Sequence, residues 1–167
     1  MIYNNILEAV GHTPMVRLNR MVEEDSAQVL VKFEAVNVGG SIKTRTALNM
    51  IEEAERKGLI KEDTIIVEPT SGNQGIGLAL VGAVKGYRTI IIMPDSVSEE
   101  RRKLVRHYGA DVKLIHDAGD IGACIDECLK TALRMQEKDP RVFVPQQFAN
   151  EDNTMAHKNH TALEIME

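Results

Sequence analysis

Apolar and polar positions follow two alternating patterns along most of the chain. Short runs rich in Val, Ile and Thr predict strands, and longer segments with apolar residues every three or four positions predict helices. The predicted strands are Met15–Leu18, Val29–Glu34, Thr64–Glu68, Thr89–Met93, Val112–His116 and Val142–Val144. The predicted helices are Ile42–Arg56, Asn73–Lys85, Ser98–His107, Ile121–Glu137 and Glu151–Met166. The last four strands are mostly uninterrupted apolar runs, which is typical of strands covered on both faces.

The order of these elements predicts an α/β fold. From about Gly40 to Val144 helices and strands alternate, which implies an open parallel sheet with right-handed crossovers and helices on both faces. The segment before Gly40 differs, because it contains two strands joined by a polar turn through Glu23–Ser26. Ligands bind beyond the carboxyl ends of the strands in such sheets. The loops that precede helices are therefore the first candidates for a site.

Several helix ends have a chemical signal. Gly58, Gly86 and Gly109 follow the first three predicted helices, where glycine most easily adopts the left-handed conformation of a C-terminal cap. Ser98 stands where a hydroxyl can cap the start of the third helix.

Composition and charge narrow the class of protein. The chain has 167 residues, 43% of them apolar and 27% charged, which suits a globular domain that needs no disulfides. The formal net charge of −5 and the lack of a Lys/Arg stripe argue against a nucleic-acid partner. No apolar run has the length of a membrane span. The start, Met-Ile-Tyr-Asn-Asn, lacks the features of a signal peptide, so we expect a cytoplasmic protein without a membrane partner.

Two pairs of residues have the spacing of metal ligands on one helix face, Cys124 with Cys128 and His157 with His160. Each pair lacks a further ligand to complete a site. We therefore expect the cysteines to be small buried side chains and the histidines to have surface or capping roles.

The segment Asn37–Lys43 combines glycines, a hydroxyl and a lysine at the start of a helix. Gly39 and Gly40 permit backbone conformations closed to other residues, and Ser41 can cap the helix. Lys43 would face the positive end of the helix dipole, which with burial favours the neutral amine that Schiff-base chemistry requires. Taken alone, the segment fits a surface lysine better. It lacks the Gly-x-x-x-x-Gly-Lys spacing of a nucleotide-binding loop.

The segment Pro69–Gly75, Pro-Thr-Ser-Gly-Asn-Gln-Gly, lies between a predicted strand and a helix. Its hydroxyls, amide and free backbone N–H groups at a helix N-terminus form a ready site for a carboxylate or phosphate. The simpler alternative, a capped turn without ligand, accounts less well for a glycine among so many polar donors. Gly72, Gly75 and Gly77 do not have the dinucleotide-binding spacing, so a nucleotide-binding domain fits poorly.

These segments together resemble the cysteine synthase (O-acetylserine sulfhydrylase) family of fold-type II pyridoxal-phosphate enzymes, which includes cystathionine β-synthase. The resemblance runs along nearly the whole chain, and its motifs occur in the family's order. They are Gly11–Leu18, Asn37–Arg45, Glu68–Gly77, Met93-Pro94, Glu100–Lys103, Tyr108–Ala110 and Pro145–Phe148.

The resemblance implies a cofactor, pyridoxal 5'-phosphate, and a role for each matching residue. Lys43 would hold the cofactor as a Schiff base and, once released by the amino acid, remove its α-proton as the general base. Asn73 would bond the cofactor's phenolic oxygen. The substrate carboxylate would be held by Thr70, Ser71, Gly72, Asn73, Gln74 and Gln147. The implied reaction is a β-replacement in which O-acetylserine and sulfide give cysteine.

Two residues depart from the family pattern. Thr44 follows the lysine where an acid is common, and Gln74 replaces a threonine in the substrate loop. Both leave the exact substrate open. A lyase that eliminates or exchanges β-substituents of cysteine or serine with release of sulfide is one alternative, and a diaminopropionate-forming synthase is another.

Family members are substantially longer, and their later half supplies the loop for the cofactor phosphate. We therefore expect residues 1–36 to belong to a larger second domain, residues 37–149 to form a small α/β domain, and residues 150–167 to be a C-terminal helix. On this view the chain is a fragment whose cofactor binding is weak or absent. A non-catalytic module that binds the C-terminal tail of serine acetyltransferase is an alternative of another class. The resemblance also implies a homodimer.

Overall fold

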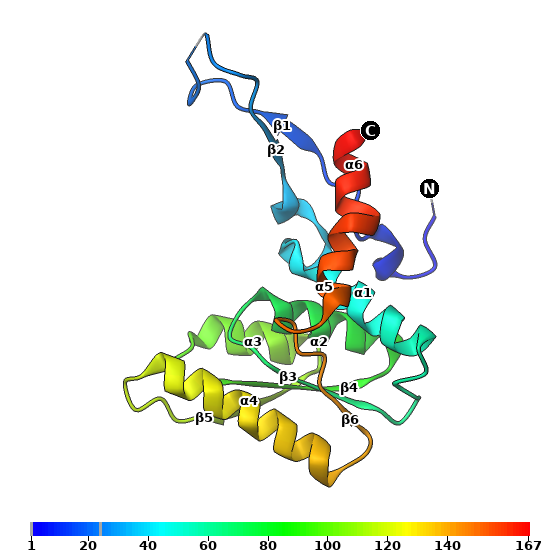
Figure 1. The fold of residues 1–167 in the computed structure, drawn as a ribbon, viewed down its shortest axis with the longest axis vertical. Coiled ribbons are helices and arrows are strands. Elements are labelled where there is room, and N and C mark those ends of the chain that lie inside the picture. The colour runs from blue at the N-terminus through cyan, green and yellow to red at the C-terminus, as the bar shows by residue number, and fades with distance from the viewer. Residues whose placement is uncertain (1, 24) are drawn as a thin grey trace.

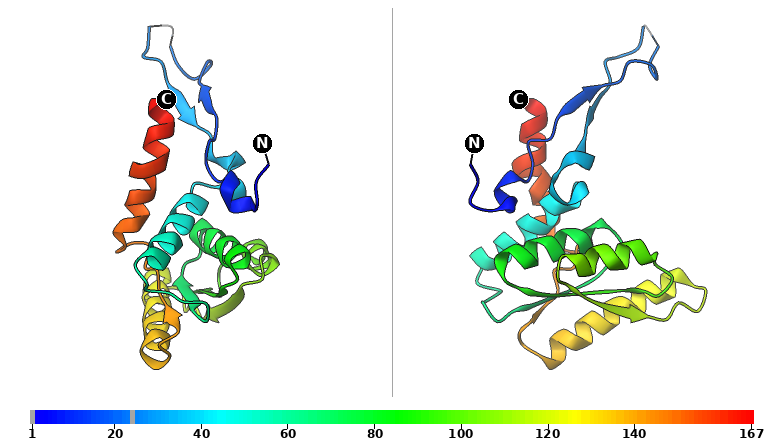
Figure 2. Two further views of the ribbon diagram at one scale, coloured as in Figure 1. Left: turned by 90° about the vertical axis from the view of Figure 1, so that its right-hand side faces the viewer. Right: turned by 180° about the vertical axis from the view of Figure 1, so that it is seen from behind.

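A computed structural model describes residues 2–23 and 25–167 of the chain. Two parts are evident in Figure 1. The first, here called the body, comprises residues 37–149 and is built around a four-stranded sheet. The second, here called the arm, comprises residues 2–23, 25–36 and 150–167, and contains a hairpin and the C-terminal helix, which rise from the same side of the body (Figures 1 and 2).

The body's sheet is parallel throughout, as the alternating pattern predicted. Its strands are β3 (Ile65–Pro69), β4 (Arg88–Pro94), β5 (Asp111–Ile115) and β6 (Val142–Phe143), in the order β5-β4-β3-β6. Val67 pairs with Ile90, and Ile90 in turn pairs with Asp111. Of the four strands of this sheet, β3 and β4 come first along the chain, and they occupy the two central positions.

Helices cover both faces of this sheet, as predicted (Figure 1). The helices α1 (Lys43–Arg56), α2 (Asn73–Lys85) and α3 (Glu99–His107) lie on one face, and α4 (Ile121–Lys138) lies on the other. Alternate residues of a strand point to opposite faces. Ile66 and Ile91 accordingly join the core beneath α1 and α2, while Val67 and Ile92 pack with Cys124 and others beneath α4.

The edge strand β5 is less covered than its sequence suggested. None of the residues of β5 is fully buried, and Leu114 is 38% exposed. An edge strand has a neighbour on one side only, and the flanking helices reach it partly. The prediction of strands covered on both faces is confirmed for β3 and β4 and is wrong for β5.

The predicted helix ends are mostly confirmed. Gly58, Gly86 and Gly109 follow α1, α2 and α3 with φ values of +69°, +82° and +84°, the left-handed conformation of a C-terminal cap. Ser98 does occupy the N-cap position of α3, but its side chain makes no capping hydrogen bond. Two acidic residues in the first turn, Glu99 and Glu100, instead complement the helix dipole.

The arm begins with a short hairpin of β1 (Met15–Arg17) and β2 (Leu30–Lys32), in which Val16 pairs with Val31. In the predicted polar turn, the N–H and the hydroxyl of Ser26 both donate to the carbonyl of Glu23; residue 24 of that turn lies outside the described residues. Three short 3-10 segments that the pattern did not predict complete the N-terminal part, namely η1 (Ile6–Ala9), η2 (Glu34–Val36) and η3 (Val38–Gly40).

The predicted C-terminal helix is continuous but changes its winding. It runs through α5 (Glu151–Ala156), a π-helical segment η4 (His157–Thr161) and α6 (Ala162–Met166). The helix passes beside the hairpin in both views of Figure 2 and packs through α5 on α1.

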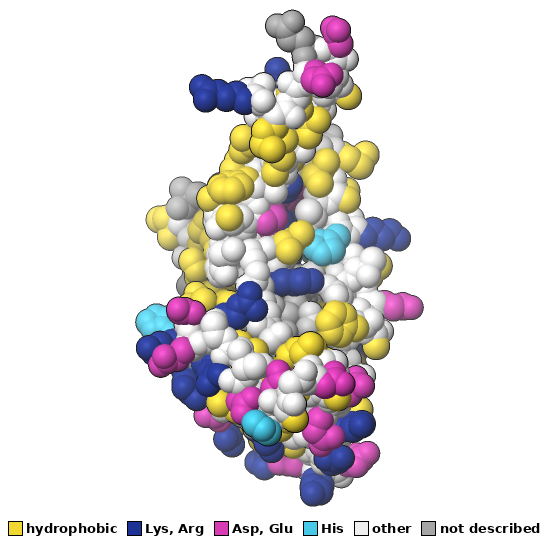
Figure 3. Space-filling view, turned by 90° about the vertical axis from the view of Figure 1, so that its left-hand side faces the viewer, with side chains coloured by type: hydrophobic (Ala, Val, Ile, Leu, Met, Phe, Trp, Pro, Cys, Tyr) yellow, Lys and Arg dark blue, Asp and Glu magenta, His cyan; other side chains and the backbone are white. Residues whose placement is uncertain are grey.

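Charged side chains join the arm to the body. Arg45 of α1 is paired with Glu34 at 2.9 Å and with Glu164 at 2.5 Å, and Lys32 is 2.6 Å from Glu164. On the face of the molecule that Figure 3 shows, apolar side chains gather over the arm, whereas charged ones are more frequent over the body. Within residues 2–23 and 25–167, no helix combines the length and the apolar character needed to cross a membrane.

Candidate active site

The Lys43 loop has the glycine conformations that its sequence predicted, but the N-cap residue of α1 is Ile42, without a side-chain cap, so the predicted cap by Ser41 is wrong. Gly39 and Gly40 have φ values of +79° and +73°, a region that residues with a side chain rarely adopt. The backbone N–H of Lys43 donates to Oγ of Ser41 at 3.2 Å. Lys43 itself is the first residue of α1 and is half-buried. The loop therefore presents a lysine at a helix N-terminus.

The helices α1 and α2 approach each other closely near this lysine. A Cβ atom added to Gly77 of α2 would lie 2.9 Å from the carbonyl oxygen of Lys43 and 3.0 Å from Cβ of Ala47. Only a glycine permits this contact. Both helices begin at the carboxyl end of β3, because α1 runs antiparallel to that strand and α2 follows it. The two candidate loops therefore lie at one edge of the sheet.

The second candidate loop, residues 69–75, leaves the N-terminus of α2 without a side-chain cap. The N–H of Thr70 continues the ladder to the carbonyl of Ile92, and Oγ1 of Thr70 accepts from the N–H of Gly72 at 3.2 Å. Gly72 is the N-cap residue, and no described side chain caps the helix. The first turn of α2 thus has N–H groups that no side chain caps, and an anion at this terminus stays a prediction. Arg101 of α3 supports the loop by donating to the carbonyl of Ser71 at 2.9 Å.

Three of the residues predicted to bind substrate line one small cavity. Thr70, Ser71 and Gln147 surround a space of about 90 Å³ together with Cys128 and Phe148. Lys43, Gly72 and Asn73 do not line this cavity, and lie at the starts of α1 and α2. The structure therefore brings three of the six residues predicted to bind the carboxylate together around one cavity, and it places Lys43 and Asn73, the predicted cofactor residues, at the starts of α1 and α2.

Gln74 and Thr44, the two residues that depart from the family pattern, have buried side chains that do not line this cavity. Gln74 is 1% exposed, and its Oε1 accepts from the hydroxyl of Thr46 at 2.7 Å, between α1 and α2. A contact from Gln74 to substrate stays a prediction, and it would require the side chain to turn. Thr44 is fully buried and packs beneath Gly39, so its replacement of an acid changes the packing of the loop.

Two residues near the site were missed by the sequence reasoning. Glu68, at the end of β3, is buried, and its carboxylate accepts from the N–H groups of Gln146 and Gln147. Burial raises the pKa of Glu68 to about 7, although these two N–H groups oppose the rise. A signal for Glu68 existed, because an acid ends an otherwise apolar strand.

His157 is the second missed residue. Burial, and then the positive charges of Lys43 and Arg45, lower the pKa of its imidazole. Its Nδ1 lies 3.1 Å from Oγ1 of Thr161. The proximity to Lys43 arises only when the C-terminal helix packs on α1, so the sequence carries no signal for it.

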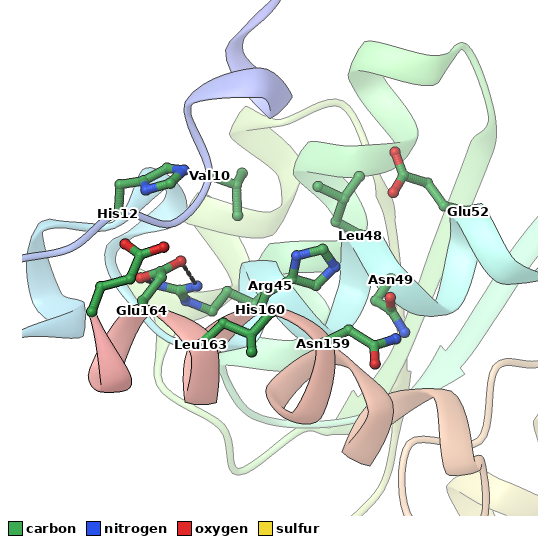
Figure 4. Close-up of a pocket in the computed structure, with 11 residues that line it drawn as sticks. Val10, His12, Arg45, Leu48, Asn49, Glu52, Asn159, His160, Leu163 and Glu164 are labelled. Atoms are coloured by element: carbon green, nitrogen blue, oxygen red, sulfur yellow. Dashed lines mark hydrogen bonds and ion pairs between the residues drawn. The ribbon is translucent and has the colours of Figure 1, made fainter.

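A larger cavity, of about 260 Å³, lies away from these loops, between α1, the C-terminal helix and the segment around His12 (Figure 4). Arg45 lines it, but its guanidinium is already bonded to the carboxylates of Glu34 and Glu164. That pairing leaves little charge for an anionic ligand. The smaller cavity beside Thr70 therefore remains the candidate site.

The two cysteines are buried, as predicted, and Cys128 contributes to the wall of the smaller cavity. Burial raises the pKa of the Cys128 thiol to about 12, so it is protonated near neutral pH. Within the described part of the chain, no group of three or more His, Cys, Asp or Glu side chains is placed to hold a metal ion.

The chain, which has a lysine at the start of α1 and an uncapped start of α2, also matches a known family. Residues 6–167 match the model of the pyridoxal-phosphate dependent enzymes, and the chain belongs to that family.

Individual relatives make the likeness more specific. The chain is 46% identical over its whole length to a cysteine synthase of Flavobacterium sp., of which it covers 53%. A hydrogen sulfide-producing enzyme from Fusobacterium nucleatum is 43% identical and superposes with a TM-score of 0.89 over 99% of this chain and 53% of that one. A lysine-to-alanine variant of O-ureido-L-serine synthase with O-ureido-L-serine bound is also 43% identical, with a TM-score of 0.89 over 99% of this chain and 50% of that one. The chain spans about half the length of the relatives it matches.

Proposed function

We propose that this chain supplies the reactive lysine and the substrate-carboxylate site of a pyridoxal-phosphate-dependent β-replacement, in which O-acetylserine and sulfide give cysteine. The observation that carries the proposal is the open N-terminus of α2, which lies beside Lys43 and is flanked by Thr70, Ser71 and Gln147. Family membership and the likeness to a cysteine synthase support it.

Lys43 and Asn73 fit the part of the cofactor that they would contact, while the loop for its phosphate belongs to the later half of the longer relatives. Lys43 is half-buried at a helix start and, among the described residues, forms no salt bridge, so no carboxylate competes for its amine. Asn73 begins the neighbouring helix and would bond the cofactor's phenolic oxygen. When bound, pyridoxal phosphate accepts electron density from the substrate's α-carbon, which lets the β-substituent depart.

The chain's own residues would position the amino acid and move its proton. The N–H groups that begin α2, with Thr70, Ser71, Gly72 and Gln147, would hold the carboxylate, because a helix N-terminus favours a negative charge. Fixing the carboxylate directs the α-hydrogen toward Lys43. Its amine would then remove that proton as the general base.

Three alternatives rest on particular observations. A β-eliminating or exchanging lyase that releases sulfide from cysteine is favoured by the likeness to the hydrogen sulfide-producing enzyme. A synthase that uses another nucleophile is favoured by the likeness to O-ureido-L-serine synthase. A carboxylate-binding module for the tail of serine acetyltransferase is a third proposal, and it uses the same helix terminus.

The proposal is tested by adding pyridoxal phosphate and recording the visible absorbance band of the lysine–cofactor adduct. O-Acetylserine with sulfide, and separately cysteine alone, are then supplied while cysteine and free sulfide are measured. Cysteine formation is expected to exceed sulfide release. The band is expected to be lost in Lys43→Ala and kept in the matched control Lys130→Ala, which removes an exposed lysine of α4. Sulfide release without synthesis would favour the lyase, and a wild-type protein without the band would reject the proposal.

The larger organisation is proposed on the same basis. The apolar outer side of the arm suggests that residues 1–36 pack against a second, larger domain, with residues 37–149 as the small domain and residues 150–167 as a connecting helix. A homodimer and a cytoplasmic location are further proposals that follow from the likeness to cysteine synthases.

A further inference from the structure

The turn that carries Gln147 has an unusual backbone. Gln146 has a φ of +54°, in the left-handed region that residues with a side chain rarely occupy. Such a conformation persists only where the surroundings impose it. The neighbouring Gln147 is buried, at 7% exposure, and lines the cavity with Thr70 and Ser71. Contacts with other residues must therefore stabilise the turn at Gln146.

Glu68 makes the contacts that hold it. Its Oε2 accepts from the N–H of Gln146 at 2.9 Å, and its Oε1 accepts from the N–H of Gln147 at 3.0 Å. The carboxylate thus binds two consecutive N–H groups across 78 and 79 positions of sequence. Glu68 is 1% exposed, so water does not compete for these bonds.

The far side of the turn is held as well. Nδ2 of Asn153 donates to the carbonyl of Gln147 at 2.7 Å, and Nδ2 of Asn150 donates to the carbonyl of Pro145 at 3.0 Å. Both polar backbone groups of Gln147 are therefore engaged, its N–H by Glu68 and its carbonyl by Asn153. This fixes the direction in which the Gln147 side chain leaves the backbone.

We propose that Glu68 is a positioning residue for substrate binding, which holds the left-handed turn at Gln146 so that Gln147 faces Thr70 and Ser71 across the cavity. The inference rests on the proposed function, since it takes Gln147 to bind the substrate carboxylate. Glu68 lies one residue before Pro69. It therefore ties two of the segments that line the cavity, residues 69–71 and 147–148, to each other.

Accepting hydrogen bonds from two consecutive backbone N–H groups requires a carboxylate side chain. It offers two equivalent acceptors to two N–H donors. In Glu68→Gln one acceptor becomes an NH2 group, which opposes an N–H of the turn. In Glu68→Asp both acceptors remain, but the side chain is shorter by one methylene. Glu62→Gln is the matched control, because Glu62 is exposed and lies in the loop before the same strand.

The test compares these variants with Gln147→Ala and with the double variant Glu68→Gln/Gln147→Ala. Hydrogen exchange reports on the amides of Gln146 and Gln147, and calorimetry gives the dissociation constant of L-alanine, an amino acid without a β-leaving group, in protein loaded with pyridoxal phosphate. In Glu68→Gln both amides are expected to exchange at least about tenfold faster and the dissociation constant to rise about tenfold, as for the loss of one buried hydrogen bond. The cofactor absorbance band should keep its intensity, and Glu62→Gln should match the wild type.

The double variant separates positioning from general stability. If Glu68 acts through Gln147, adding Glu68→Gln to Gln147→Ala should weaken binding by less than about twofold. A full tenfold loss in that background, or unchanged exchange and affinity in Glu68→Gln, would overturn the inference while leaving the proposed function intact. A wild-type protein that shows no cofactor band and binds no amino acid would overturn both. If Glu68→Gln does not fold, Glu68→Asp takes its place with the same expectations.

Discussion

Strands of the body and elements of the arm are both rich in Val, Ile and Leu, but they differ in what covers these side chains. Ile66 and Ile92 in the central strands of the body are fully buried. Leu30 in the hairpin and Ile165 in the C-terminal helix are 47% and 52% exposed. The body therefore depends on burial of apolar surface, which is the main stabilising contribution in most domains.

The arm depends more heavily on charged groups, although Leu7 reaches the core of the body and α5 packs on α1. Hydrogen bonds from Arg45 hold the pKa of Glu164 far below its usual range. Burial raises the pKa of Glu34, but bonds from Arg45, Thr13 and Asn37 outweigh it, so that the pKa is lowered overall. The candidate site lies in the part with the complete core, while the arm is fastened to it by ion pairs. The following variants test this difference.

Truncating the body's core should have the largest effect. Ile66→Ala removes a fully buried side chain from a central strand, and we expect it to lower the free energy of unfolding by about 4 kcal/mol. Urea denaturation followed by circular dichroism measures the change. The matched variant Leu30→Ala, in the exposed hairpin, should cost less than about 1 kcal/mol. Equal losses in the two variants would contradict the proposed difference between body and arm.

Removing the Arg45 guanidinium, which joins the arm to the body, should have the second-largest effect. Arg45→Met leaves the carboxylates of Glu34 and Glu164 without their main partner, which should destabilise the arm by about 3 kcal/mol. Hydrogen exchange should accelerate most in residues 151–166 and least in β3 and β4. Arg106→Met, which removes an exposed arginine of α3, is the control. Acceleration spread evenly over both parts would contradict a role specific to the arm.

The two parts should also respond to pH in opposite directions. Between pH 4.5 and about 7 the folded body keeps a proton on Glu68 that the unfolded chain has released, so the free energy of unfolding falls as the pH rises, by at most about 1.4 kcal/mol per unit. Below about pH 4.5 Glu164 is protonated in the unfolded chain but stays ionised in the folded arm, because its pKa is lowered there. The free energy of unfolding therefore falls as the pH drops.

Substitutions of Glu68 and Glu164 show which carboxyl group causes each pH dependence of the free energy of unfolding. Denaturation curves recorded from pH 3 to 8 should lose the upper slope in Glu68→Gln and should lose part of the acid slope in Glu164→Gln. An upper slope that persists in Glu68→Gln would assign that dependence to another group.

Charging the outside of the arm should have the smallest effect. Ile165→Glu changes a half-exposed side chain, and the free energy of unfolding should stay within about 0.5 kcal/mol of the wild type. Static light scattering should show less association, because the exposed apolar surface is reduced. A large loss of stability would mean that this side chain is already covered in solution.

The sequence predicted most elements of the body because their signals are local. A run such as Ile65 to Val67, or a glycine after a helix such as Gly86, determines its own conformation, and the structure follows both. The two candidate loops were found for the same reason. Contacts between distant segments carried no such signal. Glu68 acquires its role from Gln146 and Gln147, and Gln74 is turned inward by Thr46 on another helix.

The close approach at Gly77 limits how this protein can change. A single methyl group there would push against the carbonyl of Lys43 and against Ala47, so it would shift the backbone from which the amine extends. Under the proposed function, substitutions in loop residues 70–74 would change the groups around the amino acid. Position 77 offers no such freedom, because the place of the lysine relative to the loop is set by the absence of a side chain at that one residue.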